Sequence, residues 1–138
     1  MNWKLILALS SYGLAIGIGS LFGVGPTGFI WWFLWLNLFL VYAWLIATRA
    51  SGKYFLHGFI VWILNSGWIT SIHAYYLFDL SRGNGLVEIL PYGFHPQVWN
   101  LLLGLTVGVV NGTIAGLFAS VAARVLKPGD AQESEAAR

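Results

Sequence analysis

Residues 98–123 read VWNLLLGLTVGVVNGTIAGLFASVAA, a stretch without any Asp, Glu, Lys or Arg. At a rise of about 1.5 Å per residue, a helix of this length crosses the roughly 30 Å hydrocarbon core of a bilayer. Three other stretches have the same character, apart from Lys4 at the edge of the first, and they cover residues 3–24, 29–48 and 54–78. The sequence therefore predicts an all-α, polytopic membrane protein, folded as a four-transmembrane-helix bundle.

The composition supports this class. Hydrophobic residues make up 58% of the chain and charged residues only 9%, whereas soluble domains carry about 25% charged residues. The absence of cysteine excludes disulfides, thiolate metal sites and cysteine nucleophiles. The net charge of +2 comes from residues that flank the predicted spans rather than from a basic patch, so we do not expect nucleic-acid binding.

The basic residues predict the orientation in the membrane. Only Arg82 lies in the connection between the third and fourth spans; the others fall on the opposite side, namely Lys4, Arg49, Lys53, Arg124, Lys127 and Arg138. The positive-inside rule then places both termini in the cytoplasm. The first apolar stretch continues for about twenty residues, which favours a retained helix over a cleaved signal. We predict one transmembrane domain over residues 1–126 and a disordered cytoplasmic tail over residues 127–138.

Small residues recur every four positions in the fourth span, at Gly104, Gly108, Gly112, Gly116 and Ser120. Such a stripe lets another helix approach closely, at a crossing angle of about −40°. Gly13 and Gly17 have the same spacing in the first span, so we expect the first and fourth helices to touch. The stripe is open to three interpretations: close packing within one monomer, an oligomer interface, or the lining of a narrow pore.

Three of the predicted spans each carry one carboxamide side chain near their centre, at Asn37, Asn65 and Asn111. An amide left unpaired in hydrocarbon costs several kcal/mol. We therefore expect these side chains to turn inward and to bond to one another, to Ser10 or Ser11, or to backbone carbonyls. This arrangement predicts a polar layer at the bilayer midplane. Such a layer either holds the helices together through hydrogen bonds or forms a binding or constriction site for a small polar solute.

The second span is bulky almost all round, and we expect it to face lipid over a wide arc. Tyr42 is predicted to mark the inner membrane interface, where amphipathic aromatic rings gather. Trp35 and Trp62 lie deeper, which favours a lipid-facing or packing role.

Toward the outer surface, His73, Asp79, Glu88 and His95 form a possible outer polar cluster. Nitrogen and carboxylate ligands suit zinc, but the spacing of these four matches no metal motif. An ordinary polar loop is the plainer interpretation, so we predict no metal and no cofactor. His57 lies about 24 Å from His73 along the third helix, too far for the two to share one metal.

The connection over residues 79–97 is the longest between spans. Its residues 81–85 read SRGNG, which predicts a turn, and residues 86–91 form a short apolar run. We expect this run to lie in the membrane interface as a brief helix.

Several functions are made improbable by missing residues. Proton-coupled exporters need a carboxylate inside the membrane, and no Asp or Glu lies inside the predicted spans. The chain has no phosphate-binding glycine loop with a lysine. The predicted interior offers only Asn, Ser, Thr, Tyr and His as reactive groups. We therefore do not expect an enzyme.

Two segments carry a resemblance to other proteins. Met1–Ile6 and Gly52–Phe59, the latter followed by Asn65 and Trp68–Thr70, resemble small uncharacterised bacterial four-span membrane proteins. The resemblance covers the first and third spans better than the second. It implies a bacterial cytoplasmic (inner) membrane and transfers no activity to any residue.

The function predicted from the sequence is non-enzymatic. We expect a small integral membrane protein whose partners are the lipid bilayer and either copies of itself, as a homo-oligomer, or a larger membrane complex. The alternative is a channel or facilitator for a small neutral solute that passes through the amide layer.

Overall fold

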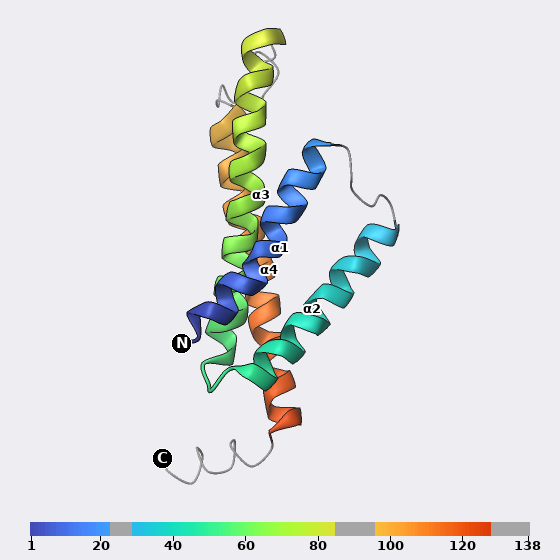
Figure 1. Cartoon of the computed structure of the whole chain (residues 1–138), viewed down its shortest axis with the longest axis vertical. Coiled ribbons are helices and arrows are strands. Elements are labelled where there is room, and N and C mark those ends of the chain that lie inside the picture. Colours follow the sequence, from blue (N-terminus) through green and yellow to red (C-terminus); the bar gives the residue numbers. More distant parts are fainter. Residues whose placement is uncertain (23–28, 85–95, 128–138) are drawn as a thin grey trace.

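The computed structural model of the chain describes residues 1–22, 29–84 and 96–127, and for residues 30–32, 77–84 and 96 it defines the backbone alone. The described chain is all-helical, as predicted, with four helices: α1 (Trp3–Leu21), α2 (Phe29–Arg49), α3 (Tyr54–Asn84) and α4 (Pro96–Leu126) (Figure 1). Three of them, α1, α3 and α4, are long and apolar enough to cross a membrane. The part of α2 with described side chains, Phe33–Arg49, is shorter.

The helix boundaries follow local sequence signals. Asn2 caps α1, because its side-chain oxygen accepts a hydrogen bond from the Leu5 amide at 3.1 Å. Pro96 opens α4, where its fixed φ suits the first turn and its missing N–H is not needed. Between α2 and α3, Gly52 and Lys53 have φ angles of +124° and +50°. These positive φ angles, at positions after α2 has ended at Arg49, let the chain reverse direction into α3.

Helix α3 is longer than the span predicted for it. It has 31 residues and continues to Asn84, so the predicted turn is wrong for residues 81–84. Glycine costs about 1 kcal/mol relative to alanine inside a helix, and a few weak helix formers at the end of a long helix do not prevent its propagation. At about 1.5 Å per residue, α3 is about 46 Å long, which exceeds the hydrocarbon core. The apolar run at residues 86–91 lies outside the described residues, as does the tail beyond Lys127.

The four helices alternate in direction, so the start of α1, the end of α2, the start of α3 and the end of α4 lie toward one end of the bundle (Figure 1). Hydrogen bonds join these ends: the Asn2 amide donates to His57 Nε2 at 2.9 Å, and Lys127 Nζ donates to the Ala50 carbonyl at 3.3 Å and to the Tyr54 hydroxyl at 3.5 Å. All the described Lys and Arg side chains belong to this end, which we call the basic end: Lys4, Arg49, Lys53, Arg124 and Lys127.

Helices α3 and α4 form the centre of the bundle and extend beyond α1 and α2 at the other end (Figure 1). The glycine stripe of α4 lies against α3: Gly104 meets Thr70, Gly108 meets Ser66, Gly112 meets Phe59 and Gly116 meets Phe55. Ser120 is half-buried and donates to the Gly116 carbonyl of its own helix at 2.8 Å. The stripe therefore serves backbone approach within one chain, the first of its three interpretations.

Helix α1 packs on α3 rather than on α4, so the predicted contact between the first and fourth helices is wrong. Gly13 and Gly17 are both buried, against Asn65 in one case and Ile69 and Ile72 in the other. The glycine spacing correctly indicated that each of these two helices packs closely against another helix. It could not identify the mate, because α3 carries no glycine stripe of its own to mark the two faces that receive α1 and α4.

The hydrophobic core lies in the half of the bundle nearest the basic end. Its aromatic part joins α2 to α3, where Phe39 stacks on Trp62 with ring centroids 4.3 Å apart and Trp35 lies 4.6 Å from the same ring. Its buried members are Ile6, Leu9, Tyr42, Ile46, Ala50, Val61, Trp62, Ala115 and Ala119. Toward the other end, α2 diverges from α3 and α4 (Figure 1), and no residue from Phe33 to Val41 is buried.

Candidate functional site

A buried polar group joins α1, α2 and α3. Asn65, on α3, is only 2% exposed, and its Oδ1 accepts a hydrogen bond from the Gly13 amide of α1 at 2.6 Å. Gly13 permits this contact, because a Cβ at that position would lie 2.6 Å from the Asn65 Cα. Among the three predicted midplane amides, Asn65 is therefore the one that turns inward.

The same turn of α1 is held from a second side. The Tyr42 hydroxyl of α2 donates to the Leu9 carbonyl at 2.7 Å in a buried contact. Leu9 and Gly13 are four residues apart, so the carbonyl and the amide belong to one step of the helix ladder. Tyr42, which was predicted to mark the inner membrane interface, is buried in the core and not on the surface of the bundle.

Two buried donors in this region bond to none of the described residues. They are Nδ2 of Asn65 and Nε1 of Trp62, which lie three residues apart on α3. An unsatisfied buried donor costs about 1–3 kcal/mol. Both groups are N–H donors, so they suit a hydrogen-bond acceptor and not a cation.

The other two predicted amides do not join Asn65. Asn37 is exposed on α2, and its Nδ2 donates to the Phe33 carbonyl of the same helix at 2.7 Å. Asn111 is half-buried on α4. The two serines expected as partners bond within α1, since Ser10 and Ser11 donate to the Leu7 and Ala8 carbonyls. The expected midplane layer is therefore not assembled in the described chain.

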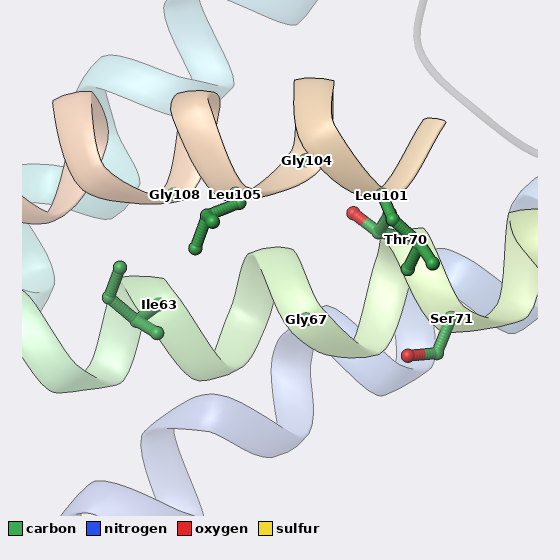
Figure 2. A pocket seen from close by; sticks show the side chains of 8 residues that line it. All are labelled: Ile63, Gly67, Thr70, Ser71, Leu101, Gly104, Leu105 and Gly108. Atoms are coloured by element: carbon green, nitrogen blue, oxygen red, sulfur yellow. The ribbon is translucent and has the colours of Figure 1, made fainter. Parts of the chain in front are cut away.

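A shallow groove of about 210 Å³ lies between α3 and α4 (Figure 2). It exists because glycines replace side chains on both walls, with Gly67 on α3 facing Gly104 and Gly108 on α4. The lining is completed by Ile63, Thr70, Ser71, Leu101 and Leu105. Nothing lies within 4 Å of a Cβ placed on Gly67. The groove is mostly apolar, and its polar side chains are those of Thr70 and Ser71.

Hydrogen bonds connect α3 and α4 beside this groove. Ser66 Oγ donates to the Gly104 carbonyl at 2.5 Å, and Asn100 Nδ2 donates to the Thr70 carbonyl at 3.1 Å. Thr70 Oγ1 donates to the Ser66 carbonyl at 2.6 Å. Each of these side chains donates to a backbone carbonyl, across the pair for Ser66 and Asn100 and within α3 for Thr70, so they act as packing contacts.

The histidines connect α1 to α3 at two levels. His57 is buried; its Nε2 accepts from the Asn2 amide and its Nδ1 lies 3.0 Å from the Lys53 carbonyl, which fixes the Nδ1–H tautomer. His73 lies 2.7 Å from Ser20 Oγ.

The possible outer polar cluster is described only in part. Glu88 and His95 lie outside the described residues, and so does the side chain of Asp79. Within the described part of the chain, no three His, Asp or Glu side chains come together as a metal site would require.

Sequence reasoning missed two members of the buried polar group. Leu9 contributes its backbone carbonyl, for which a sequence contains no signal. Tyr42 had a signal, because Trp35, Phe39, Tyr42 and Ile46 recur at steps of four, three and four, the spacing of one helix face. That face packs on the core.

No protein-family model matches this chain, and no curated protein or solved structure resembles it closely enough to count as a match.

Proposed function

We propose that this protein is a non-enzymatic subunit of a membrane assembly that crosses the bacterial cytoplasmic membrane four times, with both termini in the cytoplasm. The basic end supports this orientation, because basic residues concentrate on the cytoplasmic side of membrane proteins. The 21 residues of α2 correspond to about 32 Å of helix, enough to cross the hydrocarbon core.

The proposal depends on Asn37. In the proposed topology this residue lies twelve positions before Arg49, about 18 Å from the basic end and inside the hydrocarbon. Its amide uses one N–H on the Phe33 carbonyl, which leaves the second N–H and the side-chain oxygen unused on an exposed face. Lipid tails cannot bond to these groups. A neighbouring protein that covers this face of α2 removes the cost.

The surroundings of Asn37 support a protein partner. Between Phe33 and Val41, only Trp35, Leu38 and Phe39 of α2 are half-buried against the core, and the other residues, Asn37 among them, are exposed. The glycine stripe of α4, in contrast, already lies against α3. We therefore assign the interface to α2 and not to the glycines.

The transport alternative loses its main support. It requires the amides to line one path across the membrane, but Asn37 is exposed on α2 and the Asn65 oxygen is bonded to Gly13. No described observation favours a route for a solute.

Photo-crosslinking in cells tests the proposal. A benzophenone amino acid is introduced at Leu34, which is 44% exposed beside Asn37, or at the control position Leu117, which is 56% exposed on α4. We expect a protein adduct from position 34 and only lipid adducts from position 117. Lipid adducts from both positions would contradict a protein partner on α2.

A further inference from the structure

Helix α2 carries a repeated pattern on its exposed face. Leu34, Asn37, Val41, Trp44 and Thr48 follow one another at steps of three, four, three and four residues, and all five are exposed. We call these five residues the α2 seam. The spacing is that of a heptad repeat, which keeps one stripe of a helix against a second helix in a left-handed supercoil. The opposite face of α2, with Phe39 and Tyr42, packs on the core.

From this seam we propose that the protein on α2 is a second copy of this chain, packed in parallel with its seam against the first. This proposal builds on the proposed function and names the partner. In a membrane, two copies with the same orientation are related by a two-fold axis along the membrane normal, and each residue then meets its equivalent at the same depth. The two Asn37 side chains therefore lie opposite each other.

The free groups of Asn37 fit this symmetry. A carboxamide has two N–H donors and one oxygen acceptor. One donor is used on the Phe33 carbonyl, so one donor and one acceptor remain. Two such amides across a two-fold axis satisfy each other, because each donates its free N–H to the oxygen of the other. A single Asn at a seam position of a heptad repeat also fixes the register and the number of helices.

No hydrogen bond joins the free N–H or the oxygen of Asn37 to another described residue. Asn65 uses its oxygen on Gly13 and is buried between α1 and α3. Thr48 bonds to carbonyls of its own helix. Among the described residues none satisfies the remaining N–H and oxygen of Asn37, whereas a second Asn37 at the same depth both donates and accepts.

Cysteine crosslinking tests the seam directly. The chain contains no cysteine, so each variant carries one thiol. Val41→Cys lies on the seam and Leu36→Cys lies off it, although the two native side chains are almost equally exposed, at 49% and 51%. In membranes treated with a mild oxidant, we expect Val41→Cys to form a disulfide-linked dimer and Leu36→Cys to remain monomeric. Equal crosslinking of both variants, or none of Val41→Cys, would overturn the seam.

The mass of the full chain in native-lipid particles tests the partner. We expect a complex of twice 15.2 kDa. Asn37→Leu should raise its dissociation constant about tenfold, within the range that an interhelical polar bond contributes. Asn37→Gln keeps a carboxamide and should remain dimeric.

The outcomes separate the two proposals. If the photo-adduct formed at position 34 does not have the mass of two copies and the purified chain is monomeric, the proposal of a second copy is overturned. The proposed function as a membrane subunit then still stands. Lipid adducts alone at Leu34 overturn both. A dimer that Asn37→Leu leaves unchanged also contradicts the amide pair.

Discussion

Asn65 of α3 and Gly13 of α1 are joined by a buried hydrogen bond of 2.6 Å, and this bond depends on the absence of a side chain at position 13. The Tyr42 hydroxyl holds the Leu9 carbonyl one helical step away. One turn of α1 is therefore fixed from α2 and α3 together. The described contacts between α1 and α2 are otherwise few, so this turn is where the three helices are connected.

We expect Tyr42→Phe and Asn65→Ala to destabilise the bundle. Interhelical hydrogen bonds in membranes contribute about 0.6 kcal/mol on average and about 1.7 kcal/mol at most. Tyr42→Phe should therefore cost about 1 kcal/mol, and Asn65→Ala somewhat more because it also leaves a space in the core. The measurement is the free energy of unfolding by steric trapping in lipid bicelles.

The double variant provides the sharper test. Both bonds hold the same turn of α1, so the losses from Tyr42→Phe and Asn65→Ala should not add. Fully additive losses would show that the two side chains act independently.

Glycine substitutions on α3 should separate close packing from open surface. A Cβ on Gly58 would lie 2.7 Å from the Ala115 carbonyl oxygen of α4, and neither backbone can yield easily. A Cβ on Gly67 meets nothing within 4 Å. We expect Gly58→Ala to destabilise the α3–α4 pair by about 1–3 kcal/mol, the usual range for overpacking.

Gly67→Ala is the matched control on the same helix. It should be neutral or slightly stabilising, since alanine is the better helix former. Thermal unfolding followed by circular dichroism distinguishes the two variants, and an equal loss in both would contradict the α3–α4 packing described above.

The two histidines should control opposite ends of α1. His57 binds the Asn2 amide at the basic end, and His73 lies against Ser20 at the other end. We expect His57→Ala to increase amide hydrogen exchange near Asn2 and His73→Ala to increase it near Ser20. Each variant serves as the control for the other, and a uniform increase along α1 after either change would argue against local tethering.

The sequence predicted the helices well because apolar length is a local property. Spans and helices agree closely for α1, α2 and α4, whereas α3 continues through residues whose composition suggests a turn. The contact of Lys127 with Ala50 joins two helix ends that carry basic residues, and the side of the membrane on which these ends lie stays a prediction.

Helix pairing and the polar contacts were harder to predict. Asn37, Asn65 and Asn111 occupy similar depths, but depth does not determine which way a side chain faces. Asn65 turns inward because Gly13 leaves room for its amide, and Asn37 turns outward because Trp35 and Phe39 occupy the core face of α2. Such choices depend on which helices meet, and glycine spacing alone does not settle that.

Cysteine accessibility should establish the orientation. Ser51 is exposed in the turn between α2 and α3 at the basic end, and Asn84 ends α3 about 46 Å away by helix length. Because the chain has no native cysteine, Ser51→Cys and Asn84→Cys each give a single thiol. A membrane-impermeant maleimide added to intact cells should label Asn84→Cys and spare Ser51→Cys, and cell lysis should expose both. Labelling of Ser51→Cys in intact cells would place the basic end outside, and with it both Asn2 and Lys127, which contact the same end of the bundle.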